Sequence, residues 1–110
     1  MDKVKVSDKL LLSVEKPARY TGGELNSIVK ETARLRFALC FPDVYEIGMS
    51  HLGSRILYEV INSREEYACE RCFAPWPDME KAMRENNVPM FTLETRTPLA
   101  ECDIVGISLL

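Results

Sequence analysis

At 110 residues the chain is long enough to bury the core of one domain, and too short for the two or three domains of most complex enzymes. Its 14 basic and 17 acidic residues give a net charge of -3, so the sequence lacks the basic footprint of a protein that binds the phosphate backbone of nucleic acids. No apolar run approaches the roughly 18 residues that a membrane-spanning helix needs. We therefore expect a soluble domain that binds a small molecule or another protein.

The N-terminal part of the chain is expected to hold one short helix and a loop. Ser7 is a suitable N-cap, and Pro17 stops the helix predicted over residues 7–16. Gly22 and Gly23 follow, and both a plain turn and a contact with a ligand are open for them. The charged N-terminus lacks the apolar segment of a signal peptide, so we expect a cytoplasmic protein whose four cysteines are reduced thiols.

An apolar strand that leads into a helix is the centre of the sequence. Residues 35–41, LRFALCF, are apolar except for Arg36, which is typical of a central strand in a parallel sheet. Cys40 within this strand is interpreted as a small core residue. A helix N-terminus presents unpaired backbone N–H groups beside the carboxyl end of such a strand. The junction within residues 36–57 is therefore the predicted functional centre.

Several residues at this junction are candidates for contacts with a ligand. Asp43, Tyr45 and Glu46 follow the strand and are expected at its ligand-facing edge. For Asp43 an equally weighted alternative is a turn in which its carboxylate accepts hydrogen bonds from nearby backbone N–H groups. His51, the only histidine, either binds a ligand or is a locally satisfied imidazole, and no second histidine exists to build a zinc site with it. Gly53 costs about 1 kcal/mol in helix propensity relative to alanine, which indicates a close approach of the sheet or of a ligand.

An amphipathic helix is predicted over residues 49–62, because apolar side chains recur there at helical spacing. We expect its apolar side to cover the sheet, with the polar residues, among them Ser54, elsewhere. That side consists of Met49, Leu52, Gly53, Ile56, Leu57, Val60 and Ile61.

A second strand, over residues 68–73, contains the CxxC pattern of Cys69 and Cys72. Side chains three apart on a strand point to opposite faces of a sheet, so these two cannot bind one metal ion together unless the segment is a turn. Trp76 follows this strand and is expected at the same carboxyl edge as Asp43. There it either covers a flat ligand or packs as a partly buried residue.

The rest of the chain predicts a helix from Pro77, an edge strand over 90–93, a helical turn near 97–101 and a last strand over 103–110. This last run, DIVGISLL, is typical of a parallel strand that is covered on both faces. From it we expect the chain to be the N-terminal piece of something longer; a small protein with a central C-terminal strand is the alternative.

Four segments resemble the N-terminal region of cobalamin-binding-domain radical S-adenosylmethionine proteins. They are EKPARYTGGELN at 15–26, RFALCFPDVYEIGMSHLG at 36–53, FAPWPDMEKAMRENNVPMF at 73–91 and DIVGISLL at 103–110. The resemblance implies a Rossmann-like corrinoid-binding domain, followed by a C-terminal domain that holds a [4Fe-4S] cluster on CxxxCxxC. The implied chemistry is reductive cleavage of S-adenosylmethionine to a 5′-deoxyadenosyl radical, with cobalamin, where bound, as a methyl carrier.

The sequence departs from this family pattern in two places. CxxxCxxC is absent, so the implied radical chemistry belongs to the C-terminal domain and not to these residues. DxHxxG, which supplies an axial histidine in many cobalamin domains, is also absent, because no aspartate stands two before His51. Two alternatives stay open: the domain binds a corrinoid without a protein ligand on cobalt, or it keeps the fold and has lost the cofactor.

Together these observations predict an α/β, Rossmann-like three-layer domain over residues 35–110, preceded by an extension of helix and loop over residues 1–34. The sheet is expected to be mostly parallel, incomplete at the C-terminus and covered by helices on both faces. The leading hypothesis is the corrinoid-binding-type domain of a radical S-adenosylmethionine enzyme, and the alternative is a non-enzymatic module that docks a partner domain or protein. The candidate cofactor-binding residues are Asp43, Tyr45, Glu46, His51, Gly53 and Trp76.

Overall fold

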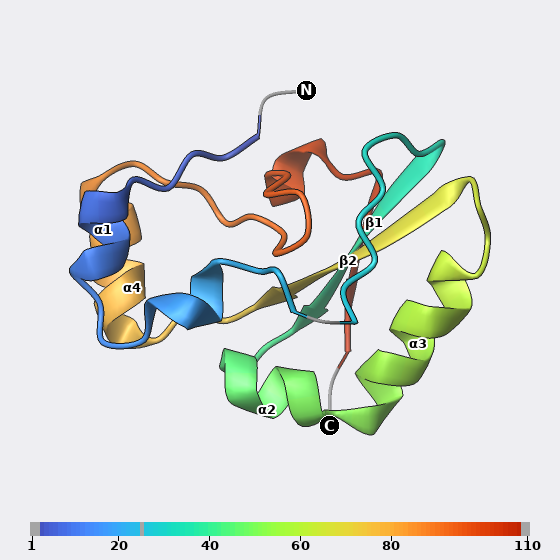
Figure 1. Cartoon of the computed structure of the whole chain (residues 1–110), viewed down its shortest axis with the longest axis horizontal. Coiled ribbons are helices and arrows are strands. Elements are labelled where there is room, and N and C mark those ends of the chain that lie inside the picture. The colour runs from blue at the N-terminus through green and yellow to red at the C-terminus, as the bar shows by residue number, and fades with distance from the viewer. Residues whose placement is uncertain (1–2, 25, 109–110) are drawn as a thin grey trace.

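The computed structural model describes residues 3–24 and 26–108 and has a parallel sheet at its centre (Figure 1). The strands are β1 (Leu35–Phe41), β2 (Tyr67–Phe73) and β3 (Ile104–Ile107), in the order β2-β1-β3. Strand β1 pairs in parallel with both neighbours, and Cys40 lies opposite Cys72 in the register. The predicted α/β class and parallel sheet are confirmed.

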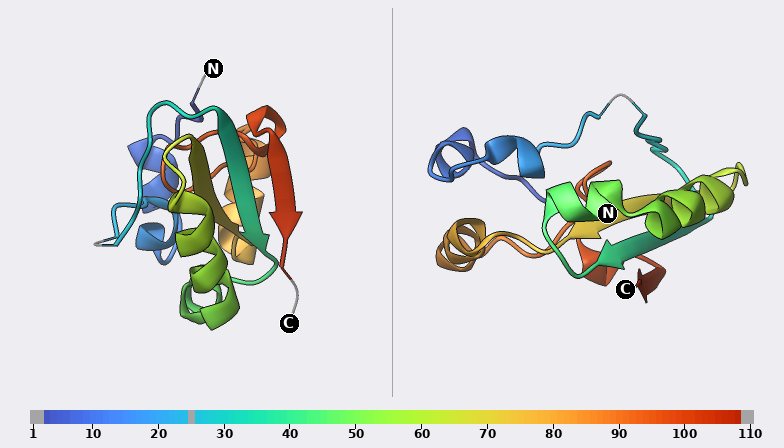
Figure 2. Two further views of the ribbon diagram at one scale, coloured as in Figure 1. Left: turned by 90° about the vertical axis from the view of Figure 1, so that its right-hand side faces the viewer. Right: turned by 90° about the horizontal axis from the view of Figure 1, so that it is seen from below.

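Two helices connect β1 to β2 where one helix was predicted. Helix α2 (Tyr45–Ser50) begins four residues before the expected start, and α3 (Leu52–Asn62) follows it directly. His51 separates them because its extended backbone ends α2, while its imidazole accepts the backbone N–H of Ser54 and so caps α3. Figure 2 shows both helices on one side of the sheet.

The face that α3 turns to the sheet is the opposite of the predicted one. Leu52, Ile56 and Val60 are 66%, 53% and 60% exposed, while Ser54, Tyr58 and Asn62 are buried. The buried polar groups find partners: the Asn62 amide, for example, bonds both the N–H and the carbonyl of Cys69. Apolar spacing alone could not reveal these partners, because it records which side chains avoid water and not which polar groups are satisfied.

The opposite face of the sheet is covered by the segment 90–103 and not by the expected layer of helices. The predicted strand over 90–93 is wrong: Phe91 forms only an isolated bridge with Pro98. The chain runs instead along the free edge of β2, where the N–H of Leu93 donates to the carbonyl of Arg71 over 2.9 Å. The predicted helical turn near 97–101 is confirmed as the 3-10 helix η2 (Leu99–Glu101).

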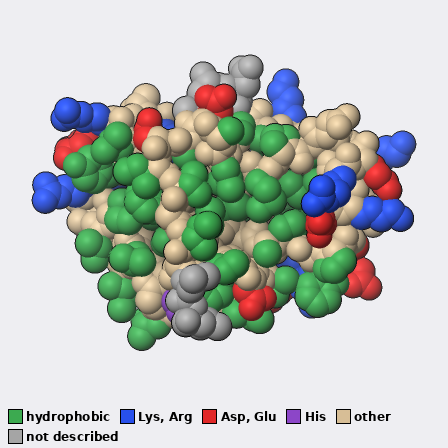
Figure 3. Space-filling view, turned by 180° about the vertical axis from the view of Figure 1, so that it is seen from behind, with side chains coloured by type: hydrophobic (Ala, Val, Ile, Leu, Met, Phe, Trp, Pro, Cys, Tyr) green, Lys and Arg blue, Asp and Glu red, His purple; other side chains and the backbone are tan. Residues whose placement is uncertain are grey.

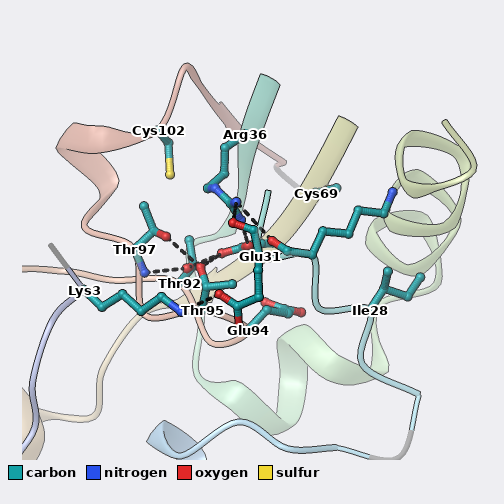
Figure 4. A network of polar contacts seen from close by, with 12 residues as sticks. Lys3, Ile28, Glu31, Arg36, Cys69, Thr92, Glu94, Thr95, Thr97 and Cys102 are labelled. Atoms are coloured by element: carbon teal, nitrogen blue, oxygen red, sulfur yellow. Dashed lines mark hydrogen bonds and ion pairs between the residues drawn. The ribbon is translucent and has the colours of Figure 1, made fainter. Parts of the chain in front are cut away.

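A buried ion pair fixes this segment to the sheet (Figure 4). Arg36 of β1 bonds Glu70 of β2, whose side chain is 1% exposed. The other oxygen of Glu70 accepts the hydroxyls of Thr92 and Thr95, each over 2.6 Å. The single charge of the apolar strand β1 is thus neutralised inside the protein, as a buried charge requires.

A second core lies beside the carboxyl end of β2, at the left of Figure 1. It is formed by α1 (Asp8–Leu12) and α4 (Pro77–Glu85), with the 3-10 helix η1 (Pro17–Tyr20) next to them. Ser7 caps α1 as predicted, although α1 is shorter than the expected 7–16. The buried residues of this core are Val4, Leu10, Val14, Met79, Met83 and Phe91. In the part of the chain that the structure describes, no helix has the length and apolarity to cross a bilayer.

Candidate functional site

A cavity of about 750 Å³ lies between α3, the sheet, Glu24 and residues 26–28. Leu39 and Phe41 line it from β1, and Arg71 and Phe73 line it from β2, so it sits at the carboxyl halves of the two strands. The exposed apolar residues of α3 form the opposing wall. Ligands of open parallel sheets bind at the carboxyl ends of the strands, which makes this cavity the first candidate site.

Arg71 organises the polar part of the cavity. Its Nε donates to Glu94 Oε2 over 2.7 Å, and its guanidinium carbon lies 4.4 Å from the centre of the Tyr58 ring. The Tyr58 hydroxyl donates to the same carboxylate oxygen over 2.8 Å. Burial raises the pKa of Glu94, which Arg71 partly offsets, and burial followed by the Glu94 charge raises the pKa of Tyr58.

Glu24 enters the cavity from the loop opposite α3. Its Oε2 accepts the Ser27 hydroxyl over 2.9 Å and lies 3.7 Å from Arg71 Nη2. Among the described residues, its Oε1 is the buried side-chain oxygen without a hydrogen-bond partner. Burial alone would raise the pKa of Glu24, but hydrogen bonds and Arg71 hold it below its ordinary value. Burial, and then the Glu24 carboxylate, raise the pKa of the nearby Tyr45 hydroxyl.

None of the six predicted site residues lines this cavity, and three of them have local structural contacts. Asp43 Oδ1 accepts the N–H of Val44 over 2.7 Å, which is the turn-forming bond weighed above. The ring of His51 stacks at 4.5 Å on that of Phe41. Gly53 lies against the same imidazole, since a Cβ there would be 3.1 Å from His51 Cε1. A ligand-binding role for these three stays a prediction.

The other three predicted residues lie near one another at the carboxyl rim of the sheet. Glu46 Oε1 accepts Arg19 Nε over 2.7 Å, and the Arg19 guanidinium carbon lies 5.3 Å from the centre of the Trp76 ring. The Tyr45 ring meets the edge of Phe73 at 5.9 Å. Trp76 remains 45% exposed. We call Arg19, Glu46 and Trp76 the rim cluster.

The CxxC cysteines point to opposite faces of the sheet, as predicted. Cys69 packs with Leu39 and Tyr58 under α3, whereas Cys72 pairs with Cys40 on the other face. Burial raises the pKa of Cys69 to about 12, so this thiol stays protonated at neutral pH. All four cysteines are free thiols, and the described residues contain no cluster of three or more metal-ligating side chains.

Sequence reasoning missed the residues that make the cavity polar. Arg71 is charged within an otherwise buried strand, which is a usable signal because such a charge needs a partner. Glu24 and Arg19 belong to the segment EKPARYTGGELN, whose resemblance to the family was noted without assigning a role to either residue. Glu94 had no signal, since it reaches Arg71 only because segment 90–103 follows the edge of β2.

A family described as the N-terminal region of radical SAM proteins matches residues 53–110, which is 58 of the 110 residues. The chain belongs to this family. Membership in the radical SAM family implies a [4Fe-4S] cluster and S-adenosylmethionine in the catalytic part, and a larger protein with other domains. The matched range contains β2, α4, β3 and all of α3 except its first residue, Leu52. No curated protein and no solved structure matches the chain.

Proposed function

We propose that this radical SAM N-terminal region is a corrinoid-binding-type domain of an enzyme whose cluster and S-adenosylmethionine chemistry lie in a C-terminal domain of the same protein. The observation that carries the proposal is the rim cluster at the carboxyl ends of parallel strands. It combines an exposed indole plane with a carboxylate and a guanidinium. This is where a Rossmann-like sheet receives a cofactor.

The state of His51 restricts the kind of corrinoid that fits. Its Nδ1 accepts the backbone N–H of Ser54 over 3.1 Å, so in the neutral ring the proton sits on Nε2. Neither nitrogen then offers a free lone pair to a metal ion. A corrinoid with His51 on cobalt does not fit, and the proposal is limited to a corrinoid without a protein ligand on cobalt.

The residues that would hold such a group are those of the rim. The indole of Trp76 offers a flat apolar face, and the carboxylates of Glu46 and Asp43 accept hydrogen bonds from the amide side chains of a corrin ring. The Tyr45 hydroxyl adds a donor beside them. A bound corrinoid would supply methyl-carrier chemistry to the rest of the protein.

Titration with hydroxocobalamin, followed by absorbance, tests this proposal on the full parent protein and on the 110-residue chain. We expect a spectral change with the parent protein and weak or no binding by the chain alone. Trp76→Ala and Glu46→Gln should each weaken binding by the parent about tenfold. Glu80→Gln is the matched control, because Glu80 also bonds an arginine in an exposed pair, on α4. A parent protein whose addition leaves the spectrum unchanged does not bind a corrinoid.

A second function is supported by strand β3. Ile104, Val105 and Ile107 are 45%, 47% and 66% exposed, and the space-filling view from behind shows apolar side chains spread over that face (Figure 3). These residues suit a non-enzymatic module that docks a partner domain or protein. Assays of iron, sulfide and S-adenosylmethionine cleavage in the reconstituted parent protein separate the two proposals, since a docking module yields none of the three.

Two further statements belong to the same proposal. We place the domain in the cytoplasm, and the four free thiols support this location. The division of the chain into an extension over residues 1–34 and a domain over residues 35–110 stays a prediction.

A further inference from the structure

Two cysteines lie side by side on the face of the sheet that points away from α3. Cys40 of β1 and Cys72 of β2 are direct partners in the parallel register, and both are free thiols. Neighbouring strands are about 4.8 Å apart, and the Cα atoms of disulfide-linked residues are roughly 4.4–6.8 Å apart. The strand spacing therefore places the two cysteines within the range of a disulfide.

The two thiols differ in their exposure to solvent and in their acidity. Cys72 is 3% exposed, whereas Cys40 is only half-buried and lies opposite Ile107, which is 66% exposed. A hydrogen bond from the Cys72 thiol lowers the pKa of Cys40, although burial opposes this shift. Donation of this bond, and then burial, raise the pKa of Cys72. Cys40 is therefore the thiol that ionises first and that a reagent in solution can reach.

The other two cysteines lack this combination of a partner and an accessible thiol. Cys69 is fully buried and lies opposite Phe37 in the sheet, and burial raises its pKa to about 12. Cys102 lies outside the strands, where its thiol donates to a backbone carbonyl, and burial raises its pKa to about 11. Reaction with a thiol reagent is therefore expected at the pair of Cys40 and Cys72.

We propose that Cys40 and Cys72 form a thiol-modification site, which a small disulfide such as glutathione disulfide converts reversibly into an intramolecular disulfide. The Cys40 thiolate attacks one sulfur of glutathione disulfide, so a mixed disulfide forms and one glutathione thiolate leaves. The Cys72 thiol then gives up its proton and its sulfur attacks Cys40 Sγ, so the second glutathione leaves as a thiolate. The two glutathione thiolates take up the two protons that the protein thiols lose.

The site lies directly before the rim of the sheet. Each cysteine stands one residue before the end of its strand, and beyond the strands the N–H of Ala74 donates to the carbonyl of Asp43 over 2.8 Å. A bond between Cys40 and Cys72 therefore joins the chain just before the loops that carry Asp43 and Trp76. Disulfides of cytosolic proteins are usually transient, which fits a modification that glutathione reverses. The proposal goes beyond corrinoid binding and does not depend on it.

Peptide mapping tests the proposal on the full chain, because trypsin places the four cysteines on four separate peptides. These peptides span residues 37–55, 65–71, 72–81 and 97–110. The chain is incubated with glutathione disulfide at neutral pH, the remaining thiols are blocked with iodoacetamide, and the unreduced digest is analysed by mass spectrometry. We expect a dominant link between 37–55 and 72–81, which dithiothreitol removes. Any other dominant link, glutathione adducts alone, or four unmodified cysteines would overturn the proposal.

Variants assign the roles of the two thiols. Cys72→Ser should stop the reaction at one glutathione adduct on Cys40, and Cys40→Ser should leave the buried Cys72 unmodified. Cys102→Ser is the matched control and should keep the link. In the wild-type chain at neutral pH, iodoacetamide should react with Cys40 at least about tenfold faster than with Cys102.

Equal rates at Cys40 and Cys102 would overturn the assignment of Cys40 as the attacking thiol. An adduct on Cys72 in the Cys40→Ser protein would do the same, because it would show that reagents reach the buried thiol directly. The peptide map of the wild-type chain remains decisive if a variant does not fold.

Discussion

The two edges of the sheet are built in different ways. Residues 92–97, here called the covering segment, lie along the edge of β2 and bond its backbone. They also reach both faces of the sheet: Glu94 bonds Arg71 on the α3 face, and Thr92 bonds Glu70 on the other. Within the described residues β3 has no neighbour on its outer side. It presents apolar side chains there, with Ile107 66% exposed.

An unpaired strand edge can pair with a strand of another chain, and the two edges of this sheet differ in whether that pairing is prevented. At β2, buried charges and threonine hydroxyls satisfy one another and fix a covering segment in one position. At β3, the unpaired backbone and apolar side chains remain available for another strand or domain. We therefore expect substitutions at the β2 edge to change folding stability, and substitutions at the β3 edge to change association.

The largest effect on stability is expected from the ion pair of Arg36 and Glu70, which lies beneath the covering segment of β2. Arg36→Met leaves the buried Glu70 carboxylate without its cation and should lower the free energy of unfolding by about 3–5 kcal/mol. Arg84→Met is the matched control, because it removes an exposed arginine–glutamate pair on α4 and should cost less than about 1 kcal/mol. Urea denaturation measures both. A loss below about 1 kcal/mol for Arg36→Met would mean that the pair does not hold the edge together.

A substitution at Gly22 tests how closely the N-terminal loop packs on the covering segment. Its φ is +70°, and a Cβ there would lie 2.6 Å from the carbonyl oxygen of Leu93, so Gly22→Ala should destabilise the protein by about 2–4 kcal/mol. Gly23 shares the positive φ but has no atom within 4 Å of such a Cβ, and Gly23→Ala should cost about 1 kcal/mol. Thermal unfolding compares the two. Equal losses would show that the Leu93 contact adds no constraint.

Because of Glu94, the stability that the covering segment contributes on the α3 face depends on pH. The two oxygens of Glu94 accept three hydrogen bonds, and an amide replaces one of these oxygens with an NH2 group that faces the same donors, so Glu94→Gln should cost about 1–2 kcal/mol in acid solution, where both side chains are neutral. Burial raises the pKa of Glu94 above the ordinary 4.5, so the stability that this group contributes is present below 4.5 and is lost as the pH rises through the raised value. The difference between wild type and variant should shrink over that interval in urea titrations. A difference that grows with pH would contradict the direction of the shift.

The smallest effect on stability is expected at the β3 edge. Ile107→Lys places a charge on a side chain that is already 66% exposed, so the free energy of unfolding should change by less than about 0.5 kcal/mol. Self-association of the chain should fall, because a lysine on an edge strand opposes strand addition. Sedimentation velocity measures this association. An Ile107→Lys protein that unfolds more readily without any change in association would reverse the contrast between the edges.

The site was only partly predictable from the sequence. Strand alternation was sufficient to separate Cys69 from Cys72, and position after a strand was sufficient to bring Glu46 and Trp76 to one rim. The cavity was not predictable, because it depends on which side of α3 turns to the sheet. Tyr58 and Asn62 decided that orientation through bonds to residues distant in sequence, such as Glu94 and Cys69.

By itself the sequence determined the parallel strands β1 and β2, the presence of helix α3 between them and the N-cap of α1, since these follow from local apolar patterns and capping residues. Only the tertiary structure decided that residues 92–97 cover the edge of β2, and which groups pair with Arg36, Arg71 and Glu24. The physical reason is that a buried charge is stabilised by whichever groups the fold brings within hydrogen-bond distance. Those groups lie up to 47 positions away along the chain, where no local pattern records them.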